Sequence, residues 1–541
     1  MRTTVSHRLL MLCMATSFIS SCSGDGSDGQ SPKIHFVSSP ECIRFSGGFP
    51  SGFTDLPGSG REAAVVQFIP TAILGLNLDP EPPGLLAESA IPNFPGIVCN
   101  PCGGIVGVDS DSDGQADICR SNELGFTCLS PVAGSLLSLD NDLVALSTSN
   151  YEQVVFFEPR SGATKLLELE TPPVSPTFDP NDWPFWPMPG NLELRSAIST
   201  RVCVYTENPD SLDADLGPNQ FCDPGRDGFV TRFTAGAAVA NDTLFVATSN
   251  LLRSSEARFA PGTVLAFDLD RSRDPIRIGP KENGSVIFTS GFNPTSLEPY
   301  VTPSGRSLLL VGVSGAVEIG SGTDLVRTDS AIDVIDVETR LLIATVPLGR
   351  AGLGASRIAI DPSRRIALMG AFTSRSIFGI DLAALDDPQL GLDSEDLPIV
   401  LDGSTPGYPD ARVFDENSRF ILPKRPDGPS DSQCASITSI AISQFERYAV
   451  ASDFCDGTVT VLDIDVPPSR SDFIDADTLL SVIRVENVVS PIVDTATGLT
   501  RAIDRILIRR GRPGIDFTGP DVYFTAGLPE GAVCGVRINS F

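Results

Sequence analysis

The sequence predicts an all-β fold. The chain of 541 residues contains 49 glycines and 44 prolines, and signals for helix starts are scarce. Short apolar strands recur between tight turns. The clearest unit, residues 356–382, reads as an alternating strand, a D-P-S-x-R turn, a second apolar strand, a polar turn and a third strand that ends in Ile-Asp-Leu. Three strands joined in this way form an antiparallel meander.

Related units recur along the chain. They lie at 237–270, 302–349 and 436–466, with weaker copies at 135–169 and 504–538. An isolated four-stranded antiparallel sheet leaves its apolar faces exposed, whereas radial repetition buries each face against a neighbouring sheet. The repeats therefore predict a β-propeller, and their spacing permits six to eight blades.

The repeats resemble the YVTN-type propeller repeats of surface-layer proteins. The resemblance rests on an alternating apolar strand, a D-P/S-x-x-R turn, a second strand and then V-I-D-V-E-T-R-L-L-I-A-T-V-P-L-G at 334–349. It is best over 237–466, and no copy contains the tetrapeptide that names the family. The resemblance implies seven four-stranded blades. We expect one propeller domain over 34–541, with Pro- and Asp-rich insertions near 80–129, 171–232 and 383–429.

The N-terminus resembles that of a bacterial lipoprotein precursor. Arg2, His7 and Arg8 precede an apolar segment at 9–19, which is too short to span a bilayer and has the anatomy of a signal peptide. The segment Ile19-Ser20-Ser21-Cys22 resembles a lipobox, which implies cleavage after residue 21 and lipidation of Cys22. The alternative is an ordinary secretory signal in which the cysteine is incidental.

A flexible tether is expected to follow the lipidated cysteine. Residues 22–33 are rich in Gly, Ser and Asp, a composition typical of a flexible linker. Ser23 follows Cys22 directly and resembles the residues that, at this position in lipoproteins, permit export to the outer membrane. We therefore expect a lipid-anchored protein at the outer membrane or cell surface, with the periplasmic side an open alternative.

The stretch D-S-D-S-D-G-Q-A-D-I-C, residues 109–119, has the spacing of a calcium loop. Oxygen ligands would come from loop positions 1, 3, 5, 7 and 9, which are Asp109, Asp111, Asp113, Gln115 and Asp117. Arg120 stands where an EF-hand has its bidentate Glu, and Cys119 makes the motif resemble a thrombospondin type 3 repeat. That resemblance implies a structural calcium ion. A calcium-dependent binding face and a metal-free acidic loop are the alternatives.

Ten of the twelve cysteines are predicted to form disulfides. Cys13 lies in the signal segment and Cys22 receives lipid, which leaves an even number of cysteines in an exported chain. Local pairing is expected for Cys203 with Cys222 and for Cys434 with Cys455. A cluster whose internal pairing stays open contains Cys99, Cys102, Cys119 and Cys128. Cys42 and Cys534 remain, one from each end of the chain, and we predict that they pair and close the ring.

Two further patterns have structural interpretations. Carboxylates end the third strand of successive repeats, and we expect them to accept backbone N–H bonds in the following turn rather than to form a catalytic ring; they are Asp268, Asp336, Asp381 and Asp463. Both tryptophans lie within 181–190. Burial against the scaffold is favoured over an exposed stacking platform for sugar or peptide.

Composition restricts the function. The formal net charge of −29 disfavours nucleic acid as a partner because it repels phosphates. The only histidines are His7, in the signal, and His35, which disfavours Ser-His-Asp, Cys-His and multi-His metal chemistry. We expect a binding or scaffold propeller for a protein or glycan rather than an enzyme. The alternatives are a calcium-dependent, lactonase-like hydrolase with carboxylates converging on the channel and a purely architectural envelope component.

Overall fold

The structure is a computed structural model of the chain. It describes residues 35–540 apart from the following gaps: 38–40, 45–49, 57–60, 68–71, 81, 91–96, 99–105, 109–117, 121–132, 141–142, 150–151, 171–178, 185, 187–192, 206–221, 224–225, 254–257, 282–283, 317–327, 354–356, 372–374, 392–397, 414–419, 423–436, 444–447, 455–456, 465–482, 490–501, 509–519 and 528–530. Within the described part of the chain, no helix is long and apolar enough to cross a membrane.

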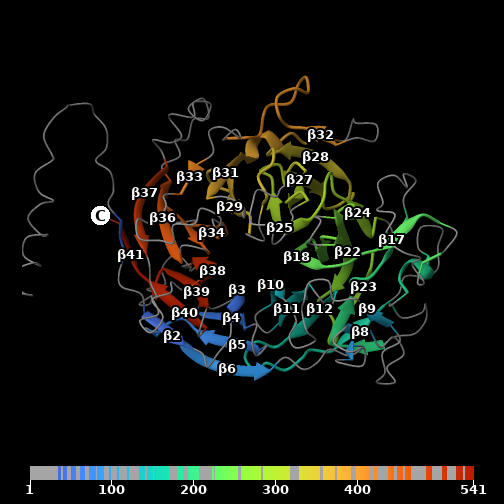
Figure 1. Ribbon diagram of the computed structural model, residues 1–541, viewed down its shortest axis with the longest axis horizontal. Helices are drawn as coiled ribbons and strands as arrows, with labels where there is room; N and C mark the ends of the chain where they lie inside the picture. The colour runs from blue at the N-terminus through green and yellow to red at the C-terminus, as the bar shows by residue number, and fades with distance from the viewer. Residues whose placement is uncertain are drawn as a thin grey trace, which may run out of the picture.

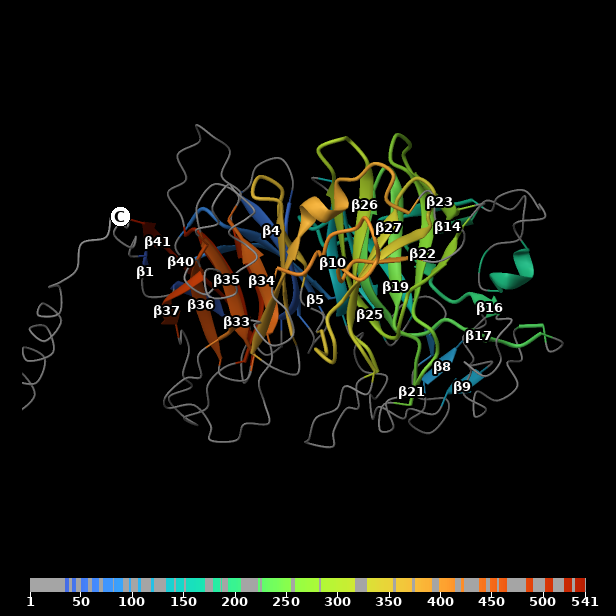
Figure 2. The ribbon, with the colours of Figure 1, turned by 90° about the horizontal axis from the view of Figure 1, so that it is seen from above.

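The fold is a β-propeller, as predicted. Antiparallel sheets stand side by side around a central channel, and each is a meander in which the inner strand lies nearest the axis (Figure 1). Figure 2, turned by 90° from Figure 1, shows the same sheets from the edge of the ring. The inner strands contact one another in chain order and the last contacts the first, in the order β3, β10, β18, β25, β29, β34, β38 and back to β3.

Six sheets among the described residues are regular blades, with four strands of at least three residues each. The first three are β3 (Pro50–Asp55), β4 (Glu62–Gln67), β5 (Ala72–Asn77) and β6 (Gly84–Ala90); β10 (Ala133–Asp140), β11 (Leu143–Thr148), β12 (Gln153–Phe157) and β15 (Ala197–Ser199); and β18 (Thr234–Ala240), β19 (Thr243–Thr248), β22 (Thr263–Asp270) and β23 (Ile276–Pro280). The other three are β25 (Pro294–Val301), β26 (Ser307–Val313), β27 (Ala331–Asp336) and β28 (Leu342–Pro347); β34 (Ile437–Ile442), β35 (Tyr448–Asp453), β36 (Thr458–Ile464) and β37 (Ile483–Val489); and β38 (Ala502–Ile508), β39 (Val522–Gly527), β40 (Ala532–Val536) and β2 (Glu41–Arg44).

The prediction of seven regular blades is wrong; six are found. A further sheet stands in the ring between the β25–β28 and β34–β37 blades, with strands β29 (Ala359–Asp361), β30 (Ile366–Gly370), β31 (Ser376–Asp381) and β33 (Phe420–Ile421). Its outer strand has only two residues. The reason is that the chain after β31 first forms η5 (Leu382–Leu385) and then β32 (Ile399–Val400), which pairs in parallel with β28 of the neighbouring blade.

The apolar core lies between neighbouring sheets. Every residue of β11, β19, β27 and β35 is buried, because the second and third strands of a blade pack against a blade on each side. This packing explains why these strands appear in the sequence as continuous apolar runs rather than as strict alternation. One such cluster joins the first blade to the last and includes Leu76 and Tyr523, and the Tyr523 hydroxyl donates to the backbone oxygen of Leu78.

The two ends of the chain close the ring. Strand β2 is the outer strand of the last blade, where Cys42 lies directly opposite Cys534 on β40. The two cysteines form a disulfide with a Cα–Cα separation of 4.0 Å. Outside the blade, β1 (His35–Val37) pairs with β41 (Ile538–Ser540). The pairing predicted from the leftover cysteines is therefore present, and a covalent bond joins the first folded strands to the last.

The segments expected to be insertions also contribute strands to the blades. Strand β6 lies within 80–129, β15 within 171–232 and β33 within 383–429. Strands β13 (Leu167–Leu169) and β14 (Glu193–Arg195) extend the β18–β23 blade, because β13 pairs in parallel with β23, and β24 (Val286–Phe288) pairs with β22. Separate small elements are β7 (Ile97–Val98), β8 (Val106–Val108), β9 (Ile118–Arg120), β16 (Cys203–Tyr205), β17 (Gly228–Val230), β20 (Leu251–Arg253), β21 (Arg258–Phe259) and η1 (Pro180–Asp182).

Both tryptophans are buried, as the sequence favoured. Trp183 and Trp186 follow η1 and pack onto Phe267 of β22. Trp186 stacks on the Phe267 ring at a centroid distance of 5.7 Å, and Trp183 meets the same ring edge-on at 5.5 Å. This part of the 171–232 segment therefore uses its aromatic side chains to attach to the outside of the ring.

Candidate functional site: the central channel

The central channel contains a cavity of about 590 Å³, lined by residues of all the inner strands. Each inner strand pairs on one side only, with the second strand of its own sheet. Its other edge is turned toward the channel, so main-chain N–H and C=O groups that the sheet does not use face the cavity. The lining is therefore rich in hydrogen-bonding groups before any side chain is considered.

Glycines let the inner strands approach one another at the channel wall. A Cβ on Gly134 of β10 would lie 2.6 Å from the backbone oxygen of Ala235 on the next inner strand. A Cβ on Gly236 of β18 would lie 2.9 Å from the Cα of Ser296 on β25. Both distances are shorter than real contacts allow, so glycine at these two positions permits the close packing that shapes the cavity.

Arg357 and Glu298 form an ion pair on one side of the cavity. Glu298 lies on β25, and Arg357 lies two residues before β29, the next inner strand. Arg357 Nε donates to Glu298 Oε2 at 2.6 Å and Nη2 donates to Oε1 at 3.1 Å. The pair is bidentate, which fixes the plane of the guanidinium. Glu298 is 14% exposed, whereas 52% of the Arg357 side chain remains accessible to the water of the cavity.

Asp55 lies across the channel from this pair. It ends β3, which stands on the opposite side of the ring from β25 and β29 (Figure 1). Its carboxylate lines the same cavity and makes no hydrogen bond within the described part of the chain. The charge of Glu298, and more weakly that of Asp55, holds the pKa of Arg357 above its ordinary value. The charge of Asp55 therefore reaches Arg357.

A second arginine on the lining is also paired. Arg271 Nη2 donates to Asp242 Oδ1 at 2.7 Å, and Nη1 donates to the backbone oxygen of Leu139 at 3.2 Å. Asp242 lies in the turn after β18, in the same blade as Arg271, and Leu139 lies near the end of β10 in the neighbouring blade. The hydrogen bond to Leu139 therefore joins two neighbouring blades.

The cavity lining includes both a donor and an acceptor. Arg357 Nη1 has no hydrogen-bond partner among the described residues, and the carboxylate of Asp55, on an inner strand across the ring, can accept hydrogen bonds. Two carboxylates line the cavity, and both oxygens of Glu298 already accept from Arg357. The described residues include no group of three or more His, Cys, Asp or Glu side chains that could hold a metal ion. This arrangement is suited to holding a polar molecule in place.

Several sequence-predicted sites lie outside the described residues. These are Cys22 with its signal segment and tether, and the calcium loop with Asp109, Asp111, Asp113, Gln115 and Asp117. The cysteines Cys99, Cys102, Cys128, Cys434 and Cys455 also lie outside them, while Cys119 is described only as part of the backbone of β9. Cys203 and Cys222 are described, and they form the predicted disulfide.

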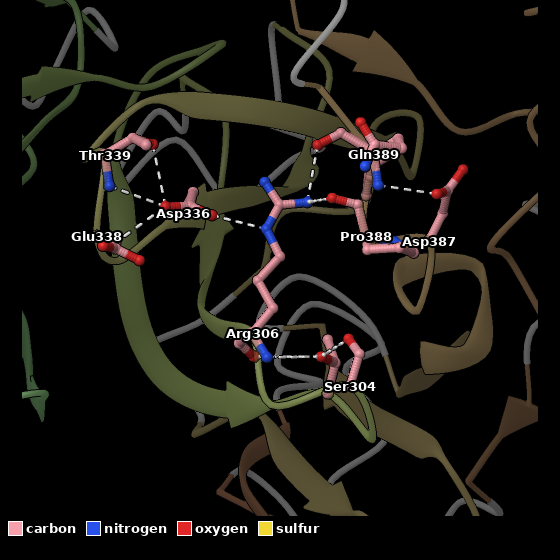
Figure 3. A network of polar contacts seen from close by, with 10 residues as sticks. Ser304, Arg306, Asp336, Glu338, Thr339, Asp387, Pro388 and Gln389 are labelled. Atoms are coloured by element: carbon pink, nitrogen blue, oxygen red, sulfur yellow. Dashed lines mark hydrogen bonds and ion pairs between the residues drawn. The ribbon is translucent and has the colours of Figure 1, made fainter.

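Two of the four strand-end carboxylates, Asp336 and Asp381, act in turns as expected. Asp336 Oδ1 accepts from the backbone N–H groups of Glu338 and Thr339 at 3.1 and 2.8 Å (Figure 3). Its Oδ2 accepts from Arg306 Nε at 2.7 Å. Asp381 accepts from the backbone N–H of Ala383 and caps η5. Asp268 pairs with Lys281 instead, and the side chain of Asp463 lies outside the described residues.

Arg306 also holds the segment that follows η5. Its Nη1 donates to the backbone oxygen of Leu390 at 2.9 Å and approaches that of Pro388 at 3.5 Å (Figure 3). One partly buried arginine therefore joins the end of β27 to the start of the 383–429 segment. Its partners are internal groups of the scaffold, so this network stabilises the fold and does not form part of the channel site.

The channel residues Asp55, Glu298 and Arg357 were not singled out from the sequence. A local signal was present, because Glu298 and Arg357 interrupt otherwise apolar inner-strand patterns in S-L-E-P-Y-V and S-R-I-A-I. Their convergence depends on ring closure, which places the first inner strand opposite the fourth and fifth. Only the three-dimensional arrangement shows that these residues line one cavity.

Comparisons with known proteins identify no family. No family model matches the sequence, and no curated protein matches it. Among solved structures, Kuenenia stuttgartiensis hydrazine synthase aligns with a TM-score of 0.45 and 11% identity, over 92% of this chain and 97% of that one. The β-propeller domain of Myceliophteria thermophila Cps50 (Swd1) aligns with a TM-score of 0.41 and 12% identity, over 92% and 99%. At these values neither comparison bears on function, and the fold assignment rests on the sheets described above.

Proposed function

We propose that this protein is a lipid-anchored propeller of the bacterial cell envelope that binds a protein or glycan ligand. The observation that carries the binding role is the channel cavity, where a bidentate ion pair with Glu298 holds the guanidinium of Arg357 and the lining also includes the carboxylate of Asp55. Rigid polar groups in a concave site orient a ligand without an ordering cost at the moment of binding. Attachment to the membrane is inferred from the lipobox-like segment that ends at Cys22 and from the polar tether after it.

Calcium at residues 109–117 is part of the same proposal. Asp109, Asp111, Asp113 and Asp117 with Gln115 supply hard oxygen ligands at the spacing that calcium loops use. We propose a structural ion there and assign it no catalytic role. The remaining cysteines, Cys434 with Cys455 and the cluster between 99 and 128, are proposed to form disulfides, in keeping with an exported chain.

The experiment is an affinity capture with the mature protein as bait. Envelope extract from the source organism is passed over the immobilised protein, before and after calcium removal. Retained molecules are then purified and bound again to fresh bait, with reduced and unfolded bait as the control. A molecule that rebinds the folded bait with a saturable dissociation constant supports the binding role. If nothing rebinds above the control in either condition, the purely architectural alternative replaces the proposal.

A further inference from the structure

The channel site specifies the chemical class of its ligand. Three charged side chains, Asp55, Glu298 and Arg357, surround one part of the cavity, and each would repel a ligand group of its own sign. An anion at Arg357 would lie near two carboxylates. A cation at Asp55 would lie within the electrostatic reach of the guanidinium that Asp55 already influences. A ligand that carries a full charge of either sign therefore meets repulsion as well as attraction.

A hydroxyl group satisfies both sides of the cavity. It donates its proton to a carboxylate and accepts from an N–H with its lone pairs. A molecule with several hydroxyls can therefore donate to Asp55 and accept from Arg357 Nη1 at the same time, while its other hydroxyls meet the unpaired main-chain groups of the inner strands. It does so without bringing a charge into the cavity.

The size of the cavity agrees with this class. A volume of about 590 Å³ lies within the range of roughly 300–1,000 Å³ that is typical of small-molecule sites. From these observations we infer that the channel binds a neutral saccharide of one or two sugar units, held between Asp55 and Arg357. The inference rests on the proposed binding function and deepens it, since it assigns the ligand class and the site within the ring.

The ion pair of Arg357 with Glu298 makes the site selective for ligand geometry. Glu298 accepts hydrogen bonds from two of the guanidinium nitrogens, and this bidentate ion pair fixes the direction of the third nitrogen, Nη1. Lysine at this position would keep the charge but not the planar, bidentate geometry. Asparagine at position 55 would keep the shape and one acceptor but would remove the charge that strengthens the bond from a sugar hydroxyl.

The test is calorimetric titration of the mature full-length protein in a zwitterionic detergent, because detergents with sugar headgroups would compete. The neutral probes are glucose, galactose, N-acetylglucosamine, maltose and lactose, and the charged counterparts are glucuronate and glucosamine. The variants are Asp55→Asn and Arg357→Lys. Arg160→Lys is the matched control, because Arg160 also donates twice to a glutamate, Glu62, and is 52% exposed, but lies outside the cavity.

We expect at least one neutral probe to bind, with its charged counterpart at least about tenfold weaker. Each cavity variant should weaken that binding by about tenfold or more, while Arg160→Lys leaves it unchanged. The inference is overturned if no neutral probe binds at about 10 mM, if a charged counterpart binds as tightly, or if both cavity variants bind like the wild type. If Asp55→Asn still rebinds the captured envelope ligand, the proposed function stands and only the channel assignment falls.

Discussion

Asp333 on β27 is a fully buried carboxylate without a cationic partner within the described part of the chain. Its oxygens accept from the backbone N–H and the hydroxyl of Ser290 at 2.7 and 2.6 Å and from the Thr345 hydroxyl at 3.0 Å. Burial raises the pKa of Asp333 to about 6, although these hydrogen bonds oppose the rise. The native state therefore binds a proton more tightly here than the unfolded chain does.

Asp333→Asn should make the protein relatively more stable as the pH rises. The stabilisation from the wild-type group is lost between about pH 4 and pH 6, because the unfolded chain releases the proton near pH 4 while the native state keeps it up to about pH 6. This pKa shift corresponds to at most about 3 kcal/mol. The unfolding free energy of the variant should rise by up to that amount relative to the wild type between pH 4 and pH 7. Urea unfolding at a series of pH values measures it, and a pH-independent difference would contradict the pKa assignment.

Asp336 provides the control of opposite sign. Burial acts to raise its pKa, but the bonds from Thr339 and the charge and hydrogen bond of Arg306 outweigh burial and hold the pKa below its ordinary value. Its carboxylate therefore stabilises the fold above the unfolded-state pKa and loses this effect as the pH falls. Asp336→Asn should become relatively less stable toward neutral pH, in the same urea series.

At the residue scale, local chemistry could be predicted and convergence could not. The turn role of Asp336 follows from its place after an apolar strand, and burial of the tryptophans follows from their proline-rich surroundings and large apolar area. The channel site joins Asp55 to Arg357, which are separated by most of the ring. No sequence pattern specifies which polar residues meet after such a closure.

The disulfide between Cys42 and Cys534 stabilises the shortest strand of the last blade. Strand β2 has four residues and lies at the outer edge, where β40 is its one pairing strand among the described residues. A strand of this length at a sheet edge detaches easily unless it is fixed. The crosslink fixes it directly, since the bonded cysteines are cross-strand neighbours.

Replacing both cysteines, Cys42→Ala with Cys534→Ala, should destabilise the whole ring. The sequence separation of 492 gives about 6 kcal/mol in the chain-entropy treatment, an upper estimate because the unfolded chain retains structure. Hydrogen exchange should become fast at 41–44 before the blades open. The comparison is the double variant Cys203→Ala, Cys222→Ala. That disulfide joins residues 19 apart in sequence, so its loss should lower the unfolding free energy by about 3 kcal/mol. An equal loss of unfolding free energy in the two double variants would contradict ring closure as the reason for the larger effect.

Calcium removal should act on one segment only. Four carboxylates at 109–117 would repel one another once the ion leaves, while each blade stays packed against its neighbours. We expect a chelator to increase protease cleavage between 99 and 128 and to leave the far-UV circular dichroism of the blades unchanged. The double variant Asp111→Asn, Asp113→Asn should be cleaved as readily as the chelated wild type, both with and without chelator. Wild-type cleavage that does not change when the chelator is added would contradict the proposed calcium site.

Elements differ in how far the sequence defines them. Strands such as β27 and β35 are long, apolar and bounded by turn residues, so their repeats could be found. Strands β13 and β32 have three and two residues and pair in parallel with a neighbouring sheet, so their register comes from packing and not from their own pattern. The short β33 left by this diversion is why seven regular blades could not be predicted correctly.

At the scale of the whole molecule, ring closure and the proposed membrane attachment involve the same end of the chain. Strand β2 begins at Glu41, 19 residues after Cys22, the proposed lipidation site. Any pull on the anchor is applied first to β1 and β2. The Cys42–Cys534 bond would then transmit that force to β40 and prevent β2 from separating from the sheet.

Cys22→Ser should abolish lipid labelling and release the protein from the membrane fraction. The thiol of Cys22 is the only one in a lipobox context, and several acyl chains anchor a protein stably because each buried methylene contributes about 0.8 kcal/mol. The measurement is incorporation of a palmitate analogue together with fractionation of the cells. Cys13→Ser is the matched control, since Cys13 lies inside the apolar segment, and it should label and fractionate like the wild type. Labelling that persists in Cys22→Ser would mean that another residue carries the lipid, and that result or an equal loss in both variants would make the assignment of the anchor to Cys22 wrong.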